Sequence, residues 1–315
     1  MKSILISLFN KEESIWVTYL EKYLPGYKVY RAEIDAYDPE MIDYAVVWKP
    51  KEHFFEGLRN LKVVFNTGAG VDNLMKFSQL SEVPIIRIVP EGLKDSMLQY
   101  ILFNVLYYHR NMYVLEEAQK QRNWIALQEP KAEDLNIGIL GLGFIGSEIA
   151  SFIGTMKYNV LGWSRTKKVI KGITTFSGET GLKNMVKKSD ILISLLPLTQ
   201  ETKGLVDRDL LEDLPKNNFF KGAFFISCGR GGVQKDNDIL WALNNGVLKG
   251  ATLDVFQNEP LPKKSPLWSH QKIRITPHLA ALNNPEDSCR LIMRQIMKVE
   301  KGEKLNNIVD FRKGY

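Results

Sequence analysis

The most constraining feature of the chain is a glycine-rich turn between a strand-like and a helix-like segment. Residues 136–140 read Asn-Ile-Gly-Ile-Leu, which is typical of a buried strand, and residues 147–156 carry apolar side chains at helical spacing. Between them Gly141, Gly143 and Gly146 form the pattern Gly-x-Gly-x-x-Gly. The first glycine permits a tight bend, the second lets a pyrophosphate approach the backbone, and the third lets the helix pack closely against the strand. The chain is therefore predicted to contain a Rossmann-type domain that binds a dinucleotide on this turn.

Short apolar runs separated by helix-length stretches recur along the whole chain. Strands that alternate with helices indicate βαβ units and parallel sheets. The predicted strands are residues 3–8, 44–48, 61–65, 85–89, 136–140, 159–163, 191–196, 223–227, 250–255 and 273–276. We predict an α/β protein with two doubly wound parallel sheets. A Rossmann nucleotide-binding domain, residues 98–285, is inserted into a flavodoxin-like substrate domain, residues 1–97 and 286–315.

Two long apolar-striped segments predict helices near the domain boundaries. One runs from Ser96 to about Lys120, and it is long enough to connect two domains. The other runs from Pro285 to Gly302, beyond the last predicted strand. Because its apolar face needs a surface to cover, we expect it to pack on the N-terminal domain.

Composition narrows the class of function. The net charge is +6, but Lys and Arg are scattered among acids, which favours small anionic ligands over nucleic acid. Two cysteines, Cys228 and Cys289, stand far apart without a metal-binding pattern, so no zinc site and no disulfide framework is predicted. No apolar run is long enough to cross a bilayer, and the first apolar stretch fits a strand better than a signal peptide. We expect a cytoplasmic protein without metal, membrane or nucleic-acid partners.

The residues after the next strand predict which dinucleotide is bound. Domains that bind NAD place Asp or Glu about 20 residues after the glycine turn, where the carboxylate accepts from the ribose hydroxyls. Here Ser164, Arg165, Thr166 and Lys167 occupy that place. A guanidinium can bind phosphate oxygens bidentately. NADP(H) is therefore predicted, with NADPH preferred, while NAD and a merely solvated basic loop stay open as alternatives.

Three side chains suited to carbonyl reduction follow later strands of the same domain. Arg230 follows residues 223–227 in a glycine-rich turn, Glu259 comes soon after residues 250–255, and His278 follows residues 273–276. Hydride transfer to a 2-keto acid needs a cation for the carboxylate, a proton donor for the alkoxide and a group that orients this donor. Each residue alone could be an ordinary surface residue. Together, at strand ends that line a ligand crevice, they are predicted to be catalytic.

These motifs resemble the D-isomer-specific 2-hydroxyacid dehydrogenases, over nearly the whole chain. The likeness rests on the glycine turn, Arg230-Gly231, residues 253–256 with Glu259-Pro260-Leu261, and Thr276-Pro277-His278. Further stretches are similar to the glyoxylate/hydroxypyruvate reductase A branch in particular: residues 68–72, 163–166, 262–268 and 312–315.

The resemblance implies roles for individual residues. His278 would be the acid/base, Glu259 its hydrogen-bond partner, and Arg230 the clamp on the substrate carboxylate and carbonyl. Asp254 would lie near the nicotinamide carboxamide. The residues predicted to bind cofactor are Gly141, Gly143, Phe144, Ile145, Gly146, Ser164, Arg165, Thr166, Lys167, Pro197, Cys228 and Asp254. Those predicted to bind substrate are Trp48, Ala69, Gly70, Val71, Arg230 and His278.

The implied reaction is NADPH-dependent reduction of glyoxylate or hydroxypyruvate to glycolate or D-glycerate. A phosphoglycerate or D-lactate dehydrogenase of the same family is an alternative, as is a nucleotide-sensing binding protein without turnover. A homodimer is expected through the helix from Ser96 and the segment around Trp124. Cys228, beside a cation, could be reactive, but a buried inert thiol is expected.

Overall fold

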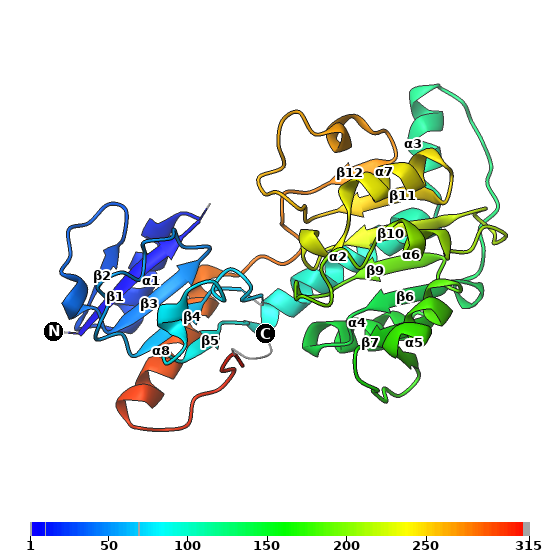
Figure 1. Cartoon of the computed structure of the whole chain (residues 1–315). Helices are drawn as coiled ribbons and strands as arrows, with labels where there is room; N and C mark the ends of the chain where they lie inside the picture. Colours follow the sequence, from blue (N-terminus) through cyan, green and yellow to red (C-terminus); the bar gives the residue numbers. More distant parts are fainter. Residues whose placement is uncertain (1, 10, 69, 311–315) are drawn as a thin grey trace. The chain divides into compact units, whose positions relative to one another are not determined.

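The structure is a computed structural model, and it describes residues 2–9, 11–68 and 70–310. The chain divides into two compact units (Figure 1). The split unit takes in the chain up to Lys94 and again from Leu282, and the inserted unit runs Asp95–Ala281. The sequence pattern places the boundaries after residues 97 and 285, within a few residues of these.

The split unit is built on five parallel strands in the order β2-β1-β3-β4-β5. They are β1 (Lys2–Leu8), β2 (Tyr27–Arg31), β3 (Tyr44–Trp48), β4 (Val63–Asn66) and β5 (Ile85–Arg87). Short 3-10 turns η1 (Pro39–Met41) and η2 (Ser78–Leu80) lie in the connections. This strand order is that of the flavodoxin-like fold, as predicted.

Helices α1 (Glu13–Tyr23) and α8 (Pro285–Glu300) pack together in the split unit. Trp16 of α1 and Ile292 of α8 belong to the same buried cluster as Ile4 and Ile6 of β1. The C-terminal helix therefore covers the N-terminal sheet, as its apolar face predicted.

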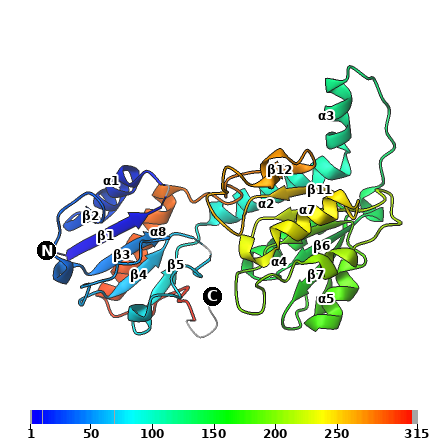
Figure 2. The ribbon, with the colours of Figure 1, turned by 45° about the horizontal axis from the view of Figure 1, so that its top comes forward.

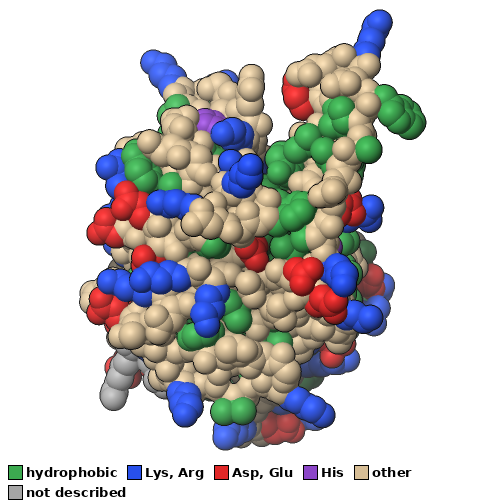
Figure 3. All heavy atoms as spheres, turned by 90° about the vertical axis from the view of Figure 1, so that its right-hand side faces the viewer, with side chains coloured by type: hydrophobic (Ala, Val, Ile, Leu, Met, Phe, Trp, Pro, Cys, Tyr) green, Lys and Arg blue, Asp and Glu red, His purple; other side chains and the backbone are tan. Residues whose placement is uncertain are grey.

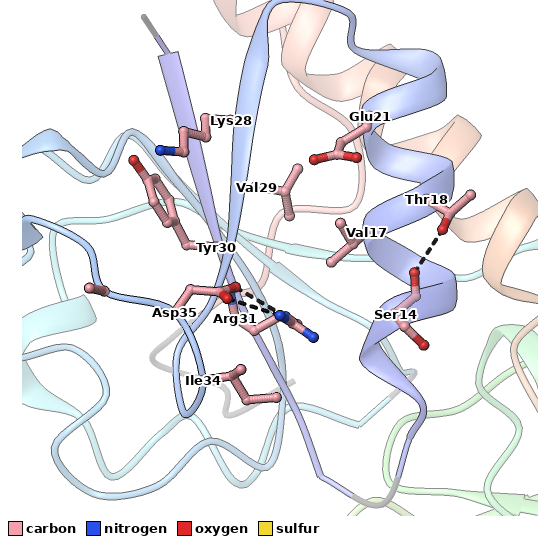
Figure 4. A pocket seen from close by; sticks show the side chains of 11 residues that line it. Ser14, Val17, Thr18, Glu21, Lys28, Val29, Tyr30, Arg31, Ile34 and Asp35 are labelled. Carbon is pink, nitrogen blue, oxygen red and sulfur yellow. Dashed lines mark hydrogen bonds and ion pairs between the residues drawn. The ribbon is translucent and has the colours of Figure 1, made fainter.

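Strand β2 was not predicted, because only Val29 of its five residues is fully buried and no apolar run results. It lies at the sheet edge, and the turn after it satisfies part of its free side. The backbone N–H of Arg31 donates to the Asp35 carboxylate at 2.8 Å, and the Arg31 carbonyl accepts from the Asp35 N–H at 2.9 Å. The Arg31 guanidinium also forms an ion pair with the Asp35 carboxylate, at 2.9 Å. Figure 4 shows this ion pair beside an open hollow between α1 and β2, which is lined by none of the predicted site residues.

The inserted unit contains seven parallel strands in the order β12-β11-β10-β9-β6-β7-β8. They are β6 (Asn136–Leu140), β7 (Asn159–Ser164), β8 (Thr174–Ser177), β9 (Ile191–Ser194), β10 (Ala223–Ser227), β11 (Leu248–Leu253) and β12 (Ile273–Ile275). Strands β7 and β8 lie on one side of β6, and β9 to β12 lie on the other. The order thus reverses between β6 and β9, which is where a doubly wound sheet binds its ligand.

Helices cover both faces of this second sheet. The buried cluster on one face includes side chains of α5 (Gly178–Val186), α6 (Arg208–Glu212) and α7 (Asp236–Asn244). The cluster on the other face includes side chains of α2 (Glu91–His109) and α4 (Phe144–Thr155). Single 3-10 turns are η3 (Ala132–Asp134), η4 (Gly231–Val233) and η5 (Pro266–Ser269). The predicted Rossmann domain is confirmed.

The prediction of one helix from Ser96 to Lys120 is wrong. The structure has two helices, α2 and α3 (Met112–Lys120), and Asn111 between them has a φ of 51°. This left-handed conformation, which Asn adopts more readily than most residues, ends the first helix. Helix α3 stands away from the body of the inserted unit (Figures 1 and 2). Within the described ranges, no helix is long and apolar enough to cross a membrane.

Candidate active site

The predicted site residues of the inserted unit lie along one edge of its sheet. The strand residues in register at this edge are Trp163, Leu140, Ser194, Ser227, Leu253 and Ile275. Because all the strands are parallel, their carboxyl ends lie side by side. The glycine turn, Arg230, Asp254 and His278 each follow one of these ends, so the fold gathers them at a single edge.

The glycine turn has the geometry that a dinucleotide requires. Gly141 has a φ of +106°, and a Cβ on Gly146 would lie only 1.9 Å from the Gly141 carbonyl oxygen. Gly143, in contrast, is exposed, and a Cβ there would meet nothing within 4 Å. The first-turn N–H groups of α4 point out of its amino end beside this open space. The turn therefore fits a pyrophosphate. Helix α4 begins at Phe144, three residues before the predicted helical stretch, so Phe144 and Ile145 lie in its first turn.

The end of β7 carries positive charge close to the glycine turn. Arg165, Thr166 and Lys167 are exposed, while the buried Ser164 hydroxyl donates to the Thr166 carbonyl at 2.8 Å. The sequence analysis did not include Lys168 among the site residues. Its ammonium group donates to the Leu142 carbonyl within the glycine turn, so Lys168 adds a third cation to Arg165 and Lys167.

Two predicted cofactor residues follow β9 and β10. Pro197 is exposed, and its carbonyl accepts from the Thr202 hydroxyl at 2.6 Å. Cys228 is 4% exposed, and burial raises the pKa of its thiol well above the usual value. Because only the thiolate is a strong nucleophile, this cysteine is held in its unreactive form.

His278 and Glu259 form a hydrogen-bonded pair. The Nδ1 atom of His278 lies 2.8 Å from Oε2 of Glu259, and the two side chains are 27% and 18% exposed. The other carboxylate oxygen accepts from the Phe256 N–H at 3.1 Å. The pairing with a carboxylate assigns the Nδ1 proton to the imidazole and leaves Nε2 as the ring nitrogen that can face a ligand.

The backbone of the histidine loop is held by Asp254. This carboxylate is 1% exposed and accepts from the Thr276 hydroxyl at 2.6 Å, the Leu279 N–H at 2.7 Å and the Ala280 N–H at 3.0 Å. His278 itself has a φ of 58°, which is strained for a residue with a side chain. Both oxygens of Asp254 thus support the loop, a role that the sequence pattern did not indicate.

Thr276 was also missed by the sequence analysis. Since its hydroxyl donates to Asp254, it accepts from the hydroxyl of Tyr100 on α2, at 2.7 Å. A chain of hydrogen bonds therefore links helix α2 to the loop that carries the histidine.

The loop that carries Arg230 packs closely against two neighbouring loops, those after β9 and β11. A Cβ on Gly231 would lie 2.0 Å from the backbone of Phe256, and a Cβ on Gly229 would lie 2.6 Å from the Leu196 carbonyl oxygen. Only glycine fits on either side of the arginine. The partly exposed guanidinium donates to the Gly229 carbonyl at 3.0 Å.

The other predicted substrate residues belong to the split unit. Trp48 ends β3, and its ring packs against Gly68. A Cβ on Gly68 would lie 2.2 Å from a ring carbon of Trp48. Gly70 and the buried Val71 continue the same loop. Ala69 and the terminal motif, residues 312–315, lie outside the described residues. Over the described part of the chain, no cluster of His, Cys, Asp and Glu is arranged to hold a metal ion.

Comparison with known proteins gives the family. The model for the NAD-binding domain of D-isomer-specific 2-hydroxyacid dehydrogenases matches residues 102–280. A D-isomer-specific 2-hydroxyacid dehydrogenase from Xanthobacter autotrophicus Py2, solved with NADPH and MES, is 36% identical over 99% of both chains, with a TM-score of 0.92. This chain belongs to the D-isomer-specific 2-hydroxyacid dehydrogenases. As a member of that family it is an NAD(P)-dependent oxidoreductase.

Two further 2-hydroxyacid dehydrogenase structures are similar over the whole fold. An NADPH-dependent glyoxylate/hydroxypyruvate reductase from Sinorhizobium meliloti, in complex with NADP and sulfate, is 35% identical over 100% of both chains, with a TM-score of 0.94. A probable 2-hydroxyacid dehydrogenase from Rhizobium etli CFN 42, in complex with NADP, HEPES and L(+)-tartaric acid, is 34% identical, with a TM-score of 0.91. That alignment covers 100% of this chain and 99% of the other.

Proposed function

We propose that the protein reduces glyoxylate and hydroxypyruvate to glycolate and D-glycerate with NADPH. The observation that carries the proposal is the 2.8 Å contact between His278 and Glu259, on the same sheet edge as Arg230 and the glycine turn. The relative from Sinorhizobium meliloti is named for this activity and was solved with NADP. The relative from Rhizobium etli was solved with tartaric acid, which is itself a 2-hydroxy acid.

The chain's own residues bind the keto acid and deliver a proton. A bound nicotinamide dinucleotide supplies the hydride for the carbonyl carbon. The Nε2–H of His278 donates its proton to the carbonyl oxygen as negative charge develops there. Glu259 holds the Nδ1 proton and stabilises the imidazolium, and Arg230 binds the substrate carboxylate and carbonyl.

The remaining predicted contacts complete the proposal. The backbone N–H groups of Ala69, Gly70 and Val71 donate to the substrate carboxylate, and Trp48 lines the pocket for its side chain. Phe144 and Ile145 lie at the pyrophosphate. Pro197 and Cys228 would contact the cofactor, and Asp254 would lie near the nicotinamide carboxamide.

The preference for NADPH follows from the end of β7. Ser164, Arg165, Thr166 and Lys167 offer two cations and two hydroxyl groups where the adenosine ribose is expected, and no carboxylate. Arg165→Ala should lower the affinity for NADPH and leave that for NADH almost unchanged. An unchanged NADPH to NADH affinity ratio would refute this assignment.

We also propose a cytoplasmic homodimer. Large apolar side chains are exposed around α2, α3 and the segment after α3: Phe103 at 55%, Met112 at 39%, Trp124 at 100% and Leu127 at 40%. Figure 3 shows hydrophobic side chains along the projecting arm, which contains α3, and on the surface at the base of this arm. Light scattering should give twice the chain mass, and Trp124→Glu should shift it toward the monomer. Both described cysteines are free thiols, which suits a reducing compartment.

The direct test is a panel of 2-keto acids with NADPH and NADH. We expect NADPH oxidation with glyoxylate and hydroxypyruvate at higher kcat/KM than with pyruvate or 3-phosphohydroxypyruvate. Preference for pyruvate would assign a D-lactate-type enzyme, and preference for the phosphorylated acid a phosphoglycerate-type enzyme. Tight NADPH binding without oxidation across the panel would indicate a sensing protein.

A further inference from the structure

A buried asparagine of the split unit holds the glycine-containing loop after β4. Asn66, the last residue of β4, is 0% exposed. Its Nδ2 donates to the carbonyl of Gly68 at 2.8 Å and to that of Gly70 at 2.9 Å. One amide nitrogen therefore uses both of its N–H groups on this loop.

Two other side chains hold the preceding carbonyl. The Nζ atom of Lys11 lies 3.3 Å from the Thr67 carbonyl oxygen and 3.1 Å from the Thr67 hydroxyl oxygen. The Nδ2 of Asn283 donates to the same carbonyl at 2.7 Å. Lys11 comes from the connection between β1 and α1, and Asn283 from the segment before α8. Three separate parts of the split unit thus donate to one short loop.

These bonds determine how the loop's own donors point. In a planar trans peptide, the N–H points away from the carbonyl of the same peptide unit. Because the carbonyls of Thr67 and Gly70 are held, the N–H groups of Gly68 and Val71 are directed away from the donors that hold them. Within the described residues, neither N–H has a hydrogen-bond acceptor. Backbone N–H groups that have no acceptor within the protein can donate to a bound anion.

We propose that Lys11, Asn66 and Asn283 are positioning residues for the carboxylate of the substrate. By holding the carbonyl groups of the loop, they keep its N–H groups directed at the anion. This inference rests on the proposed function, in which the same loop binds the keto acid. None of the three residues belongs to the motifs that carry the family resemblance.

The contribution of Lys11 depends on pH. Its ammonium lies 5.1 Å from the centre of the Trp16 ring and 5.4 Å from that of Trp48, and burial lowers its pKa to about 8. Three other charged groups lie near Lys11. Glu12 accepts a hydrogen bond from the Ser14 hydroxyl, and Glu13 accepts one from the Leu8 N–H. The ammonium of Lys49 lies 5.8 Å from the centre of the Trp48 ring. Above pH 8 Lys11 loses its positive charge and one donor. The affinity for the carboxylate should therefore fall.

The test compares wild type with Lys11→Met, Lys11→Arg and Asn283→Ala, and with Lys28→Met as a matched control. Lys28 is an exposed lysine on β2 of the same unit. For Lys11→Met we expect the KM for glyoxylate to rise about tenfold, the scale of one bond to a charged group. The kcat should change less than threefold, and the Kd for NADPH should stay unchanged. Asn283→Ala should raise KM several-fold, and Lys28→Met should match wild type.

The pH profile separates positioning from mere structural support. The KM of wild type should rise between pH 7 and 9.5, whereas Lys11→Arg, which stays charged, should show a smaller rise. Equal profiles for wild type and Lys11→Arg would overturn the inference. An unchanged KM in both a folded Lys11→Met and Asn283→Ala would do the same.

Calorimetric binding of oxalate to the NADPH-loaded protein keeps this test independent of turnover. Suppose that the wild type turns over no keto acid, so that the proposed function fails. Weaker oxalate binding by Lys11→Met and Asn283→Ala than by wild type would still support the positioning role. Oxalate binding that is absent in wild type, or equal in wild type and both variants, would refute the positioning role.

Discussion

Asp254→Asn is the substitution that most sharply separates two roles for one residue. The family resemblance implies a contact with the nicotinamide carboxamide. The structure shows a carboxylate that is 1% exposed and accepts three hydrogen bonds from the loop around His278. If Oδ1 of the asparagine keeps the hydrogen bonds from the Thr276 hydroxyl and the Leu279 N–H, the asparagine NH2 group must face the Ala280 N–H. Two hydrogen-bond donors then oppose each other.

The magnitude of this effect can be worked from the contacts. A buried N–H without an acceptor costs about 1–3 kcal/mol, and replacing charge-assisted bonds by neutral ones costs about 1 kcal/mol more. Asp254→Asn should therefore lower the free energy of unfolding by about 2–4 kcal/mol. For a domain of this size, that corresponds to a fall in Tm of roughly 4–16 °C. Because the same loop positions His278, kcat with glyoxylate should fall about 10- to 100-fold.

Thermal unfolding, steady-state kinetics and NADPH titration together test the loop-holding role. Asp190→Asn is the matched control, since Asp190 is 5% exposed and accepts from the Asn136 N–H at 2.8 Å and Asn218 Nδ2 at 2.7 Å, at the amino end of the same sheet. It should lower Tm similarly and change kcat less than threefold. An unchanged Tm in Asp254→Asn with greatly weakened NADPH binding would show that the carboxylate serves the cofactor instead.

Two further predictions concern the cofactor turn and the α1–α8 contact. Gly146→Ala would place a Cβ 1.9 Å from the Gly141 carbonyl oxygen, so NADPH binding measured by fluorescence titration should weaken at least tenfold; unchanged binding would contradict the account of the turn. The Tyr23 hydroxyl and the Arg290 guanidinium lower the pKa of Glu286 from 4.5 to about 2. The ionised Glu286 therefore stabilises the folded state fully above pH 4.5, and this stabilisation is lost as the pH falls toward 2. Glu286→Gln should lower the urea midpoint at pH 7, by a difference that shrinks between pH 5 and 3; a constant difference would refute this sign.

The sequence predicts the central parts of both sheets because those strands are buried on both faces and form continuous apolar runs. The edge strands β2 and β8 could not be predicted, because most of their side chains are not fully buried and no apolar run results. In β8 no side chain is fully buried, and in β2 only Val29 is. The break between α2 and α3 also escapes, since Asn111 enters the left-handed region without a Gly or Pro to mark it.

The site divides in the same way. The Glu259 and His278 pair could be predicted because chemistry requires these residue types at strand ends. The support from Asp254 and Thr276, and the hold of Asn66 on the loop after β4, could not. These are contacts between side chains and backbone groups in loops, whose directions follow from the fold and not from residue spacing.

The most direct test of the central claim is the kcat of His278→Ala with saturating NADPH and glyoxylate. His270→Ala, in a polar loop of the same unit, is the control. We predict a loss of about 10²- to 10⁴-fold in kcat for His278→Ala with an unchanged Kd for NADPH, and no change for the control. Turnover by His278→Ala within a few-fold of wild type would contradict the assignment of His278 as the proton donor.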